Sequence, residues 1–179
     1  MSRLIQILLV LSLGSPAWAE LRLPALFSDG MVLQHNRLVP VWGWAGSGEK
    51  VTVLISEQSF STTTDEHGKW ALKLAPMPVS EQPLDIVIKG ETNTITLRNV
   101  LFGEVWLASG QSNMEWDVKR SMDAEKNILE ADYPQIRMFT VVKHGAEEPL
   151  DDVEGQWQVC NSDTVPGFSA AAYYFALDL

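Results

Sequence analysis

Cysteine and histidine are scarce in this sequence. Cys160 is the single cysteine, so no disulfide can form within the chain. A lone cysteine is most often a small buried side chain and less often a reactive thiol, and we expect Cys160 to be buried. The three histidines, His35, His67 and His144, show no metal-ligand spacing with one another or with the cysteine. The sequence therefore predicts no metal site, and loop positions are favoured for His35 and His67.

Basic residues are in the minority. Thirteen lysines and arginines stand against 23 aspartates and glutamates, which gives a formal net charge of −10 at pH 7. A protein that neutralises phosphates needs a basic patch or stripe, and the sequence contains none. The composition argues against a nucleic acid partner, and repulsion between like-charged molecules is enough to explain the acidic surface.

The sequence has no apolar run long enough to cross a bilayer core, which takes roughly 20 residues. It does begin with a basic residue, Arg3, followed by an apolar stretch over residues 4–14 and an Ala-x-Ala end at Ala19. This order is typical of a secretory signal peptide. Because Glu20 and not a cysteine follows Ala19, lipid attachment is not expected. We predict that residues 1–19 direct secretion to the periplasm or the exterior, and that the chain has no stable membrane anchor.

Residues 20–99 have the pattern of short strands separated by glycine- and proline-containing turns. Strands at this spacing suggest an antiparallel β-sandwich domain. The expected strands cover residues 39–45, 51–55, 59–64, 70–74, 85–89 and 94–97.

Three tryptophans of this region allow two interpretations. At a period of two, Trp42 and Trp44 point to the same face of their strand, and that face is either the core or a surface for stacking on sugar rings together with Trp70. The pattern favours the core. The second interpretation makes the β-sandwich a non-catalytic carbohydrate-binding or interaction module.

Residues 100–179 have a different pattern. Residues 105–108 form a short apolar run suited to a buried strand, and after Trp116 a helix is expected with Val118, Met122 and Leu129 on one face. Residues 136–142 are predicted to form a second strand. Strand, helix and strand in this order indicate the right-handed parallel crossover of α/β domains.

A mostly buried helix is expected over residues 168–177. Two parallel strands and two helices cannot cover both faces of a parallel sheet. We therefore expect residues 100–179 to be the first part of an incomplete α/β domain.

Ser112 is the candidate nucleophile. A strand that leads through a tight turn into a helix can expose a serine at the carboxyl edge of a sheet, where ligands bind. Gly110 would permit an unusual backbone angle or a close approach, and the N–H groups of the helix start could stabilise an oxyanion. In this interpretation Ser112 attacks an ester after a histidine, oriented by a carboxylate, has taken its proton. The alternative is an ordinary turn in which Ser112 or Asn113 caps a helix.

A longer stretch favours the nucleophile. Residues 103–116, GEVWLASGQSNMEW, resemble the nucleophile block of the sialate O-acetylesterases, a branch of the SGNH hydrolases. Further segments also fit the family: residues 26–34, 39–45, 68–70, 134–139 and 168–170.

The resemblance implies a flavodoxin-like SGNH domain and a cofactor-free hydrolysis of O-acetyl esters on sialic acid or related sugars. It implies that Ser112 is the nucleophile, that its backbone N–H is one oxyanion donor, and that Gly110, Gln111 and Asn113 shape the turn. The catalytic Asp and His of this family, usually spaced Asp-x-x-His, belong to a later block that is not present in this chain. We therefore predict that this chain is an incomplete and inactive fragment of the esterase.

His144 is the only histidine after Ser112. It follows the second predicted strand, so it could lie near Ser112 with a carboxylate from Glu147 or Glu148. The position three residues before it is Val141, however, and a solvated loop histidine is the favoured interpretation. Neighbouring acids such as Glu147-Glu148 and Asp151-Asp152 could suggest calcium or glycosidase chemistry, but such pairs in a loop are more often simply solvated.

Overall fold

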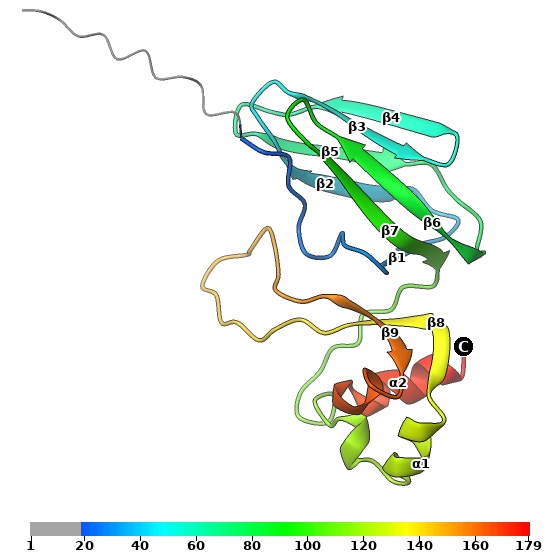
Figure 1. The fold of residues 1–179 in the computed structure, drawn as a ribbon. Coiled ribbons are helices and arrows are strands. Elements are labelled where there is room, and N and C mark those ends of the chain that lie inside the picture. The colour runs from blue at the N-terminus through cyan, green and yellow to red at the C-terminus, as the bar shows by residue number, and fades with distance from the viewer. Residues whose placement is uncertain (1–18) are drawn as a thin grey trace, which may run out of the picture.

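The computed structural model describes residues 19–179, which are mostly strands and connecting loops with short helices (Figure 1). The predicted signal peptide, residues 1–19, lies outside the described residues except for its last position. No helix within residues 19–179 is long and apolar enough to cross a membrane.

Residues 21–103, called here the strand-rich part, form a five-stranded sheet and a separate two-stranded ribbon (Figure 1). The order in the sheet is β1-β7-β6-β3-β4, and the ribbon pairs β2 with β5. The strands are β1 (Val32–Gln34), β2 (Val39–Trp44), β3 (Lys50–Ile55), β4 (Gln58–Thr63), β5 (Lys69–Leu74), β6 (Ser80–Lys89) and β7 (Thr94–Gly103).

All but one of these strand pairs are antiparallel. β1 runs parallel to β7, in the register Val32↔Leu101 to Gln34↔Gly103. The expectation of a purely antiparallel sandwich is therefore wrong at this edge. The reason is that β1 is only three residues long and joins the sheet as an edge strand after the loop of residues 23–31, in the direction of its neighbour. The sheet is mixed.

The sheet and the ribbon bury their apolar side chains in one shared core. Val39 and Val41 of β2 and Leu74 of β5 pack in the same cluster as Val53 of β3 and Ile88 of β6. Burial of each large aliphatic side chain contributes on the order of 1.5–3 kcal/mol. This core makes the strand-rich part a rigid base for the segments that leave it.

Trp42 and Trp44 share a face of β2, but it is not the core face. Val39, Val41 and Gly43 face the core, so the two tryptophans lie on the opposite, outer face and are only partly buried. Trp42 still reaches the edge of the core through an edge-to-face contact with Phe27, at 4.7 Å between ring centroids. Of the three tryptophans, it is Trp70 of β5 that lies in the core, where it is 3% exposed.

The strand predicted at residues 105–108 does not form. Residues 104–110 have no regular structure, and Val105, Trp106 and Leu107 are 44%, 59% and 92% exposed. A buried parallel strand needs a neighbour along each edge, and residues 19–179 offer this run none. The apolar run is instead an exposed connection between the strand-rich part and the residues after it.

The helix predicted after Trp116 is present only as two short pieces, η1 (Val118–Arg120) and α1 (Ala124–Leu129). The prediction that Val118, Met122 and Leu129 share one apolar face is wrong. Val118 is buried, but Met122 and Leu129 are 85% and 75% exposed. Asp123 between the two pieces adopts a left-handed backbone with φ of 54°, which interrupts the helical periodicity.

β8 (Asp132–Phe139) pairs antiparallel with β9 (Trp157–Asn161), so the predicted parallel crossover is also wrong. The second predicted strand exists, but its partner lies later in the sequence, because residues 105–108 are not a strand. The expected final helix is confirmed as α2 (Ala170–Leu177), which follows η2 (Val165–Gly167). It is less buried than expected, since only Ala170 and Tyr173 are fully covered.

A second, smaller core lies within residues 117–179, called here the C-terminal part. Cys160 is buried there, as predicted. Burial raises the pKa of its thiol to about 11, so it stays protonated at neutral pH. The buried members of this core are Val118, Ala131, Met138, Cys160, Val165, Ala170 and Tyr173.

β8 and β9 also hold the two parts together. The Arg137 guanidinium donates to the backbone oxygen of Gly30 at 3.3 Å and to Asn99 Oδ1 at 3.1 Å. Trp157 Nε1 donates to the backbone oxygen of Leu26 at 2.8 Å. The C-terminal part is thus attached to the loop of residues 23–31 and to β7, and residues 104–116 connect the two parts along the chain.

Candidate functional site

Ser112 lies in a tight exposed turn of the connecting segment, residues 104–116. The backbone oxygen of Gln111 accepts from the N–H of Met114 at 2.9 Å and of Glu115 at 3.3 Å. Ser112 and Asn113 therefore occupy the middle of the turn, and both are exposed. Their own N–H groups donate to no acceptor within residues 19–179. The turn therefore carries an exposed hydroxyl and backbone N–H groups that have no acceptor among the described residues.

Gly110 permits a close approach inside this turn. A Cβ atom at Gly110 would lie 3.3 Å from the Cβ of Met114, closer than ordinary van der Waals contact. Its φ is not in the left-handed region. Of the two roles considered for this glycine, the geometry supports close approach.

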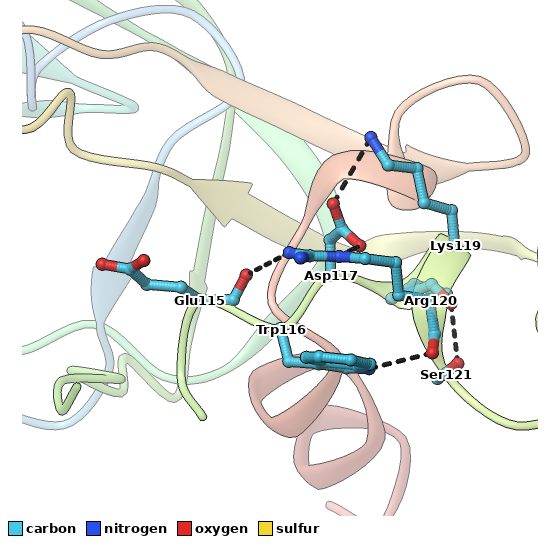
Figure 2. Close-up of polar contacts among 7 residues, drawn as sticks. Glu115, Trp116, Asp117, Lys119, Arg120 and Ser121 are labelled. Atoms are coloured by element: carbon cyan, nitrogen blue, oxygen red, sulfur yellow. Dashed lines mark hydrogen bonds and ion pairs between the residues drawn. The ribbon is translucent and has the colours of Figure 1, made fainter. Parts of the chain in front are cut away.

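The residues that follow the turn are fixed by Arg120 (Figure 2). The Arg120 guanidinium lies over the Trp116 ring at 4.8 Å and donates to the backbone oxygen of Glu115 at 3.0 Å and to Asp117 Oδ1 at 2.6 Å. Trp116 Nε1 in turn donates to the backbone oxygen of Arg120 at 2.9 Å. The hydrogen bond from Arg120, helped by Lys119, lowers the pKa of Asp117, so this carboxylate is charged at neutral pH.

The start of α2 supports the same residues from the other side. Ala170 N–H donates to the backbone oxygen of Trp116 at 2.8 Å, and Val118 N–H donates to that of Phe168 at 3.0 Å. The Ser169 hydroxyl lies 3.2 Å from the sulfur of Met114. Residues 168–170 were expected to begin a helix and to share the family resemblance, and the structure adds that they contact the serine block.

The residues that precede the turn are fixed to β1. Val105 N–H donates to Gln34 Oε1 at 3.0 Å, and His35 Nε2 lies 2.7 Å from Glu104 Oε1. The hydrogen bond from His35 is the main cause that lowers the pKa of Glu104. His35 follows β1 directly, outside any strand, as expected. Its pairing with Glu104 gives no signal in the sequence, because 69 positions separate the two residues.

No base for Ser112 is found among the described residues. Ser112 Oγ makes no hydrogen bond within residues 19–179, His35 is engaged with Glu104, and His67 lies 3.6 Å from Glu66. His144 is exposed in the loop between β8 and β9 and has no hydrogen bond or ion pair to any described residue. The solvated-loop interpretation of His144 therefore fits its surroundings.

The paired acids also form no metal site in the described part of the chain, where no group of three or more potential ligands occurs. Glu147 and Glu148 are exposed. Asp151 pairs with Lys69 at 2.5 Å, and Asp152 Oδ1 accepts from Ala25 N–H at 2.8 Å. These two aspartates attach the acidic loop to the strand-rich part.

Comparison with known proteins gives consistent relatives, although no protein-family model matches. Sialate O-acetylesterase of Rattus norvegicus is 31% identical over 164 residues, 85% of this chain and 30% of the relative. The Homo sapiens enzyme is 29% identical over 180 residues, 88% and 34% of the two chains. A crystal structure of a carbohydrate acetylesterase from Xanthomonas citri matches with a TM-score of 0.87 and 31% identity, over 89% of this chain and 37% of that one. The chain thus spans about a third of the length of these relatives.

Proposed function

Because the chain belongs to the sialate O-acetylesterase family, we propose that it supplies the nucleophile of a carbohydrate O-acetylesterase and that Ser112 is this nucleophile. The observation that carries the proposal is the exposed turn at Ser112, held on both sides by hydrogen bonds, in a chain related to esterases over most of its length. The substrates proposed are O-acetyl esters of sialic acid or of related sugars.

In the proposed reaction, Ser112 Oγ attacks the acetyl carbonyl carbon while a general base takes the hydroxyl proton. The carbonyl oxygen becomes an oxyanion, which the free Ser112 N–H can stabilise. When the carbonyl re-forms, the ester C–O bond breaks and the sugar oxygen receives the proton from the base. Water, activated by the same base, then hydrolyses the acetyl-serine and releases acetate.

We also propose that this chain alone has little or no esterase activity. No described histidine or carboxylate reaches Ser112, and without a base a serine hydroxyl is a weak nucleophile. The Asp and His that the family resemblance implies would come from residues beyond these 179, as would the strands needed to complete an SGNH domain around residues 105–108.

The test compares the purified chain with the same chain extended by the part of the rat relative that lies beyond the matched region, using p-nitrophenyl acetate. We expect background turnover by the chain alone. In the extended protein, Ser112→Ala should lower turnover on the order of a thousandfold or more, because a triad nucleophile contributes at least that much. Ser109→Ala is the matched control, since it removes an exposed hydroxyl from the same segment and should keep activity.

Two results would contradict the proposals. If Ser112→Ala left the extended enzyme as active as Ser109→Ala does, Ser112 would not be the nucleophile. If the chain alone turned over the ester and lost this on Ser112→Ala, the proposal of an inactive chain would be wrong.

A further inference from the structure

A small pocket lies on the outer face of the ribbon formed by β2 and β5, away from the Ser112 segment. Its volume is about 240 Å³, and its lining includes Trp42, Trp44, Trp70, Lys69 and Asp151. We propose that this pocket binds one uncharged pyranose ring of a glycan chain. None of its lining residues belongs to residues 104–116, so the proposal is independent of the esterase function.

The aromatic side of the pocket comes from strand pairing. Trp42 lies opposite Ala71 and Trp44 opposite Lys69 across the ribbon. Ala71 is exposed and has a small side chain, so it leaves room beside the indole of Trp42. The faces of aromatic rings carry negative partial charge and attract the positively polarised C–H groups of a sugar ring. The partly exposed surface of these two tryptophans therefore suits a flat pyranose ring.

Both tryptophans are held in place before any ligand arrives. The Arg22 guanidinium lies over the Trp44 ring at 4.0 Å, and Phe27 contacts Trp42 edge to face at 4.7 Å. Binding would then cost little side-chain entropy, because these rings are already ordered.

Polar groups suited to sugar hydroxyls surround the aromatic surface. Lys69 Nζ and Asp151 Oδ2 form a half-exposed ion pair at 2.5 Å. Asp65 Oδ1 accepts from the N–H groups of His67 and Lys69 at 2.9 and 2.8 Å, and Oδ2 accepts from no described residue. Apolar walls with a few fixed polar groups are the usual composition of a small-molecule site.

Charge and size select the class of ligand. Two carboxylates, Asp65 and Asp151, line the pocket, and two cations, Lys69 in the lining and Arg22 over the Trp44 ring, balance them, so no excess positive charge is left to hold a sugar carboxylate. The volume is below the roughly 300–1,000 Å³ of pockets that enclose drug-sized ligands, which limits the occupant to about one ring. A neutral sugar residue meets both conditions, and the acidic sugar sialic acid does not.

Asp151 belongs to the acidic loop of the C-terminal part, while the other lining residues belong to the strand-rich part. The pocket is therefore complete only when both parts are present. The experiment must use the whole chain.

The test titrates the whole chain with xylohexaose, cellohexaose and hexasialic acid, and follows tryptophan fluorescence and saturation-transfer NMR. We expect saturable binding of at least one neutral oligosaccharide with a Kd near or below about 1 mM. Hexasialic acid, a chain of matched length in which every ring carries a carboxylate, should bind at least about tenfold more weakly.

Ala71→Phe fills the pocket without removing a contact and should weaken the binding at least about tenfold, with an unchanged melting temperature. Trp44→Ala is a second variant, to be used if Ala71→Phe alters folding. It should also weaken the binding at least about tenfold. Leu38→Ala is the matched control, because Leu38 is 59% exposed on the strand-rich part and does not line the pocket. Absence of saturation by both neutral oligosaccharides, undiminished binding in folded Ala71→Phe or Trp44→Ala, or equal binding of hexasialic acid would overturn the proposal.

Discussion

His35 Nε2 lies 2.7 Å from Glu104 Oε1, and this contact joins the residue after β1 to the residue after β7. The two strands are parallel neighbours, paired up to Gln34↔Gly103. The contact therefore sits at their shared carboxyl end, where the chain leaves the sheet toward Ser112. It fixes the beginning of the connecting segment to the rigid strand-rich core.

The His35–Glu104 contact predicts a pH-dependent contribution to stability. The pKa of Glu104 is lowered from its ordinary value of 4.5, chiefly by the hydrogen bond from His35. A lowered carboxyl pKa stabilises the fold above the unfolded-state pKa, and this stability is lost as the pH falls through the folded-state pKa. Glu104→Gln should therefore lower the melting temperature at pH 6, and the difference from the unmodified chain should shrink below pH 4.5.

Thermal unfolding by circular dichroism between pH 3 and 7 measures this difference. Glu57→Gln, in the turn between β3 and β4, removes an exposed carboxylate that has no hydrogen bond to a described residue. It should shift the melting temperature little at any of these pH values. If the melting temperatures of Glu104→Gln and the unmodified chain differed by the same amount from pH 3 to pH 7, the stabilising role of the ionised Glu104 would be contradicted.

Arg120 is expected to matter more for the connecting segment than its neighbour Lys119. Arg120→Ala removes the ring contact with Trp116 and the hydrogen bonds to Glu115 and Asp117, and should lower the melting temperature by roughly 2–4 °C. Lys119→Ala removes only one ion pair at 3.3 Å, from a lysine side chain that is 60% exposed, and should change the melting temperature by less than about 1 °C. Differential scanning calorimetry of both variants checks this order, and equal effects would show that the Arg120 contacts add nothing.

The strand pattern of residues 39–97 could be predicted from the sequence because each strand finds its partners within the same region. Alternating apolar residues in β3 and β6 face the shared core, and three of the connections, residues 45–49, 64–68 and 90–93, carry glycine. The outer position of Trp42 and Trp44 was missed, since alternation shows that two residues share a face but not which face is buried. In the structure Val39 and Val41 occupy the buried face of β2, so the tryptophans lie on the other face.

The region after residue 103 was predicted less well, for a physical reason. The composition of residues 105–108 is that of a central strand, but a strand forms only when neighbours satisfy its backbone groups. Within residues 19–179 no such neighbour is available, and β8 pairs with β9 instead. The position of Ser112 in a turn was predictable from local residues. Its supports at Gln34, His35 and residues 168–170 were not, because these contacts join distant parts of the sequence.

The first residues of the chain give a prediction about secretion. Expression with the native N-terminus in a bacterium should yield a processed protein that begins at Glu20, because signal peptidase cleaves after an Ala-x-Ala end. N-terminal sequencing of the periplasmic and medium fractions measures the cleavage site. Ala19→Leu should block processing, whereas Ser15→Ala should leave it intact. A secreted protein that kept Met1, or a chain found only in the cytoplasm, would contradict the proposed signal peptide.

Gly110 is expected to control the position of Ser112 more than the stability of the chain. In Gly110→Ala the new Cβ would meet Met114 Cβ at 3.3 Å, so the turn must shift by a few tenths of an ångström. Displacements of a reacting group of about 1 Å can cost roughly a hundredfold in rate, so we expect at least a severalfold loss of kcat in the enzyme extended with the rat sequence. Gly145→Ala is the matched control, because nothing lies within 4 Å of its added Cβ, and it should keep full activity. Initial rates with p-nitrophenyl acetate and melting temperatures of both variants separate the two effects. Equal rates would show that the Gly110–Met114 contact does not position the nucleophile.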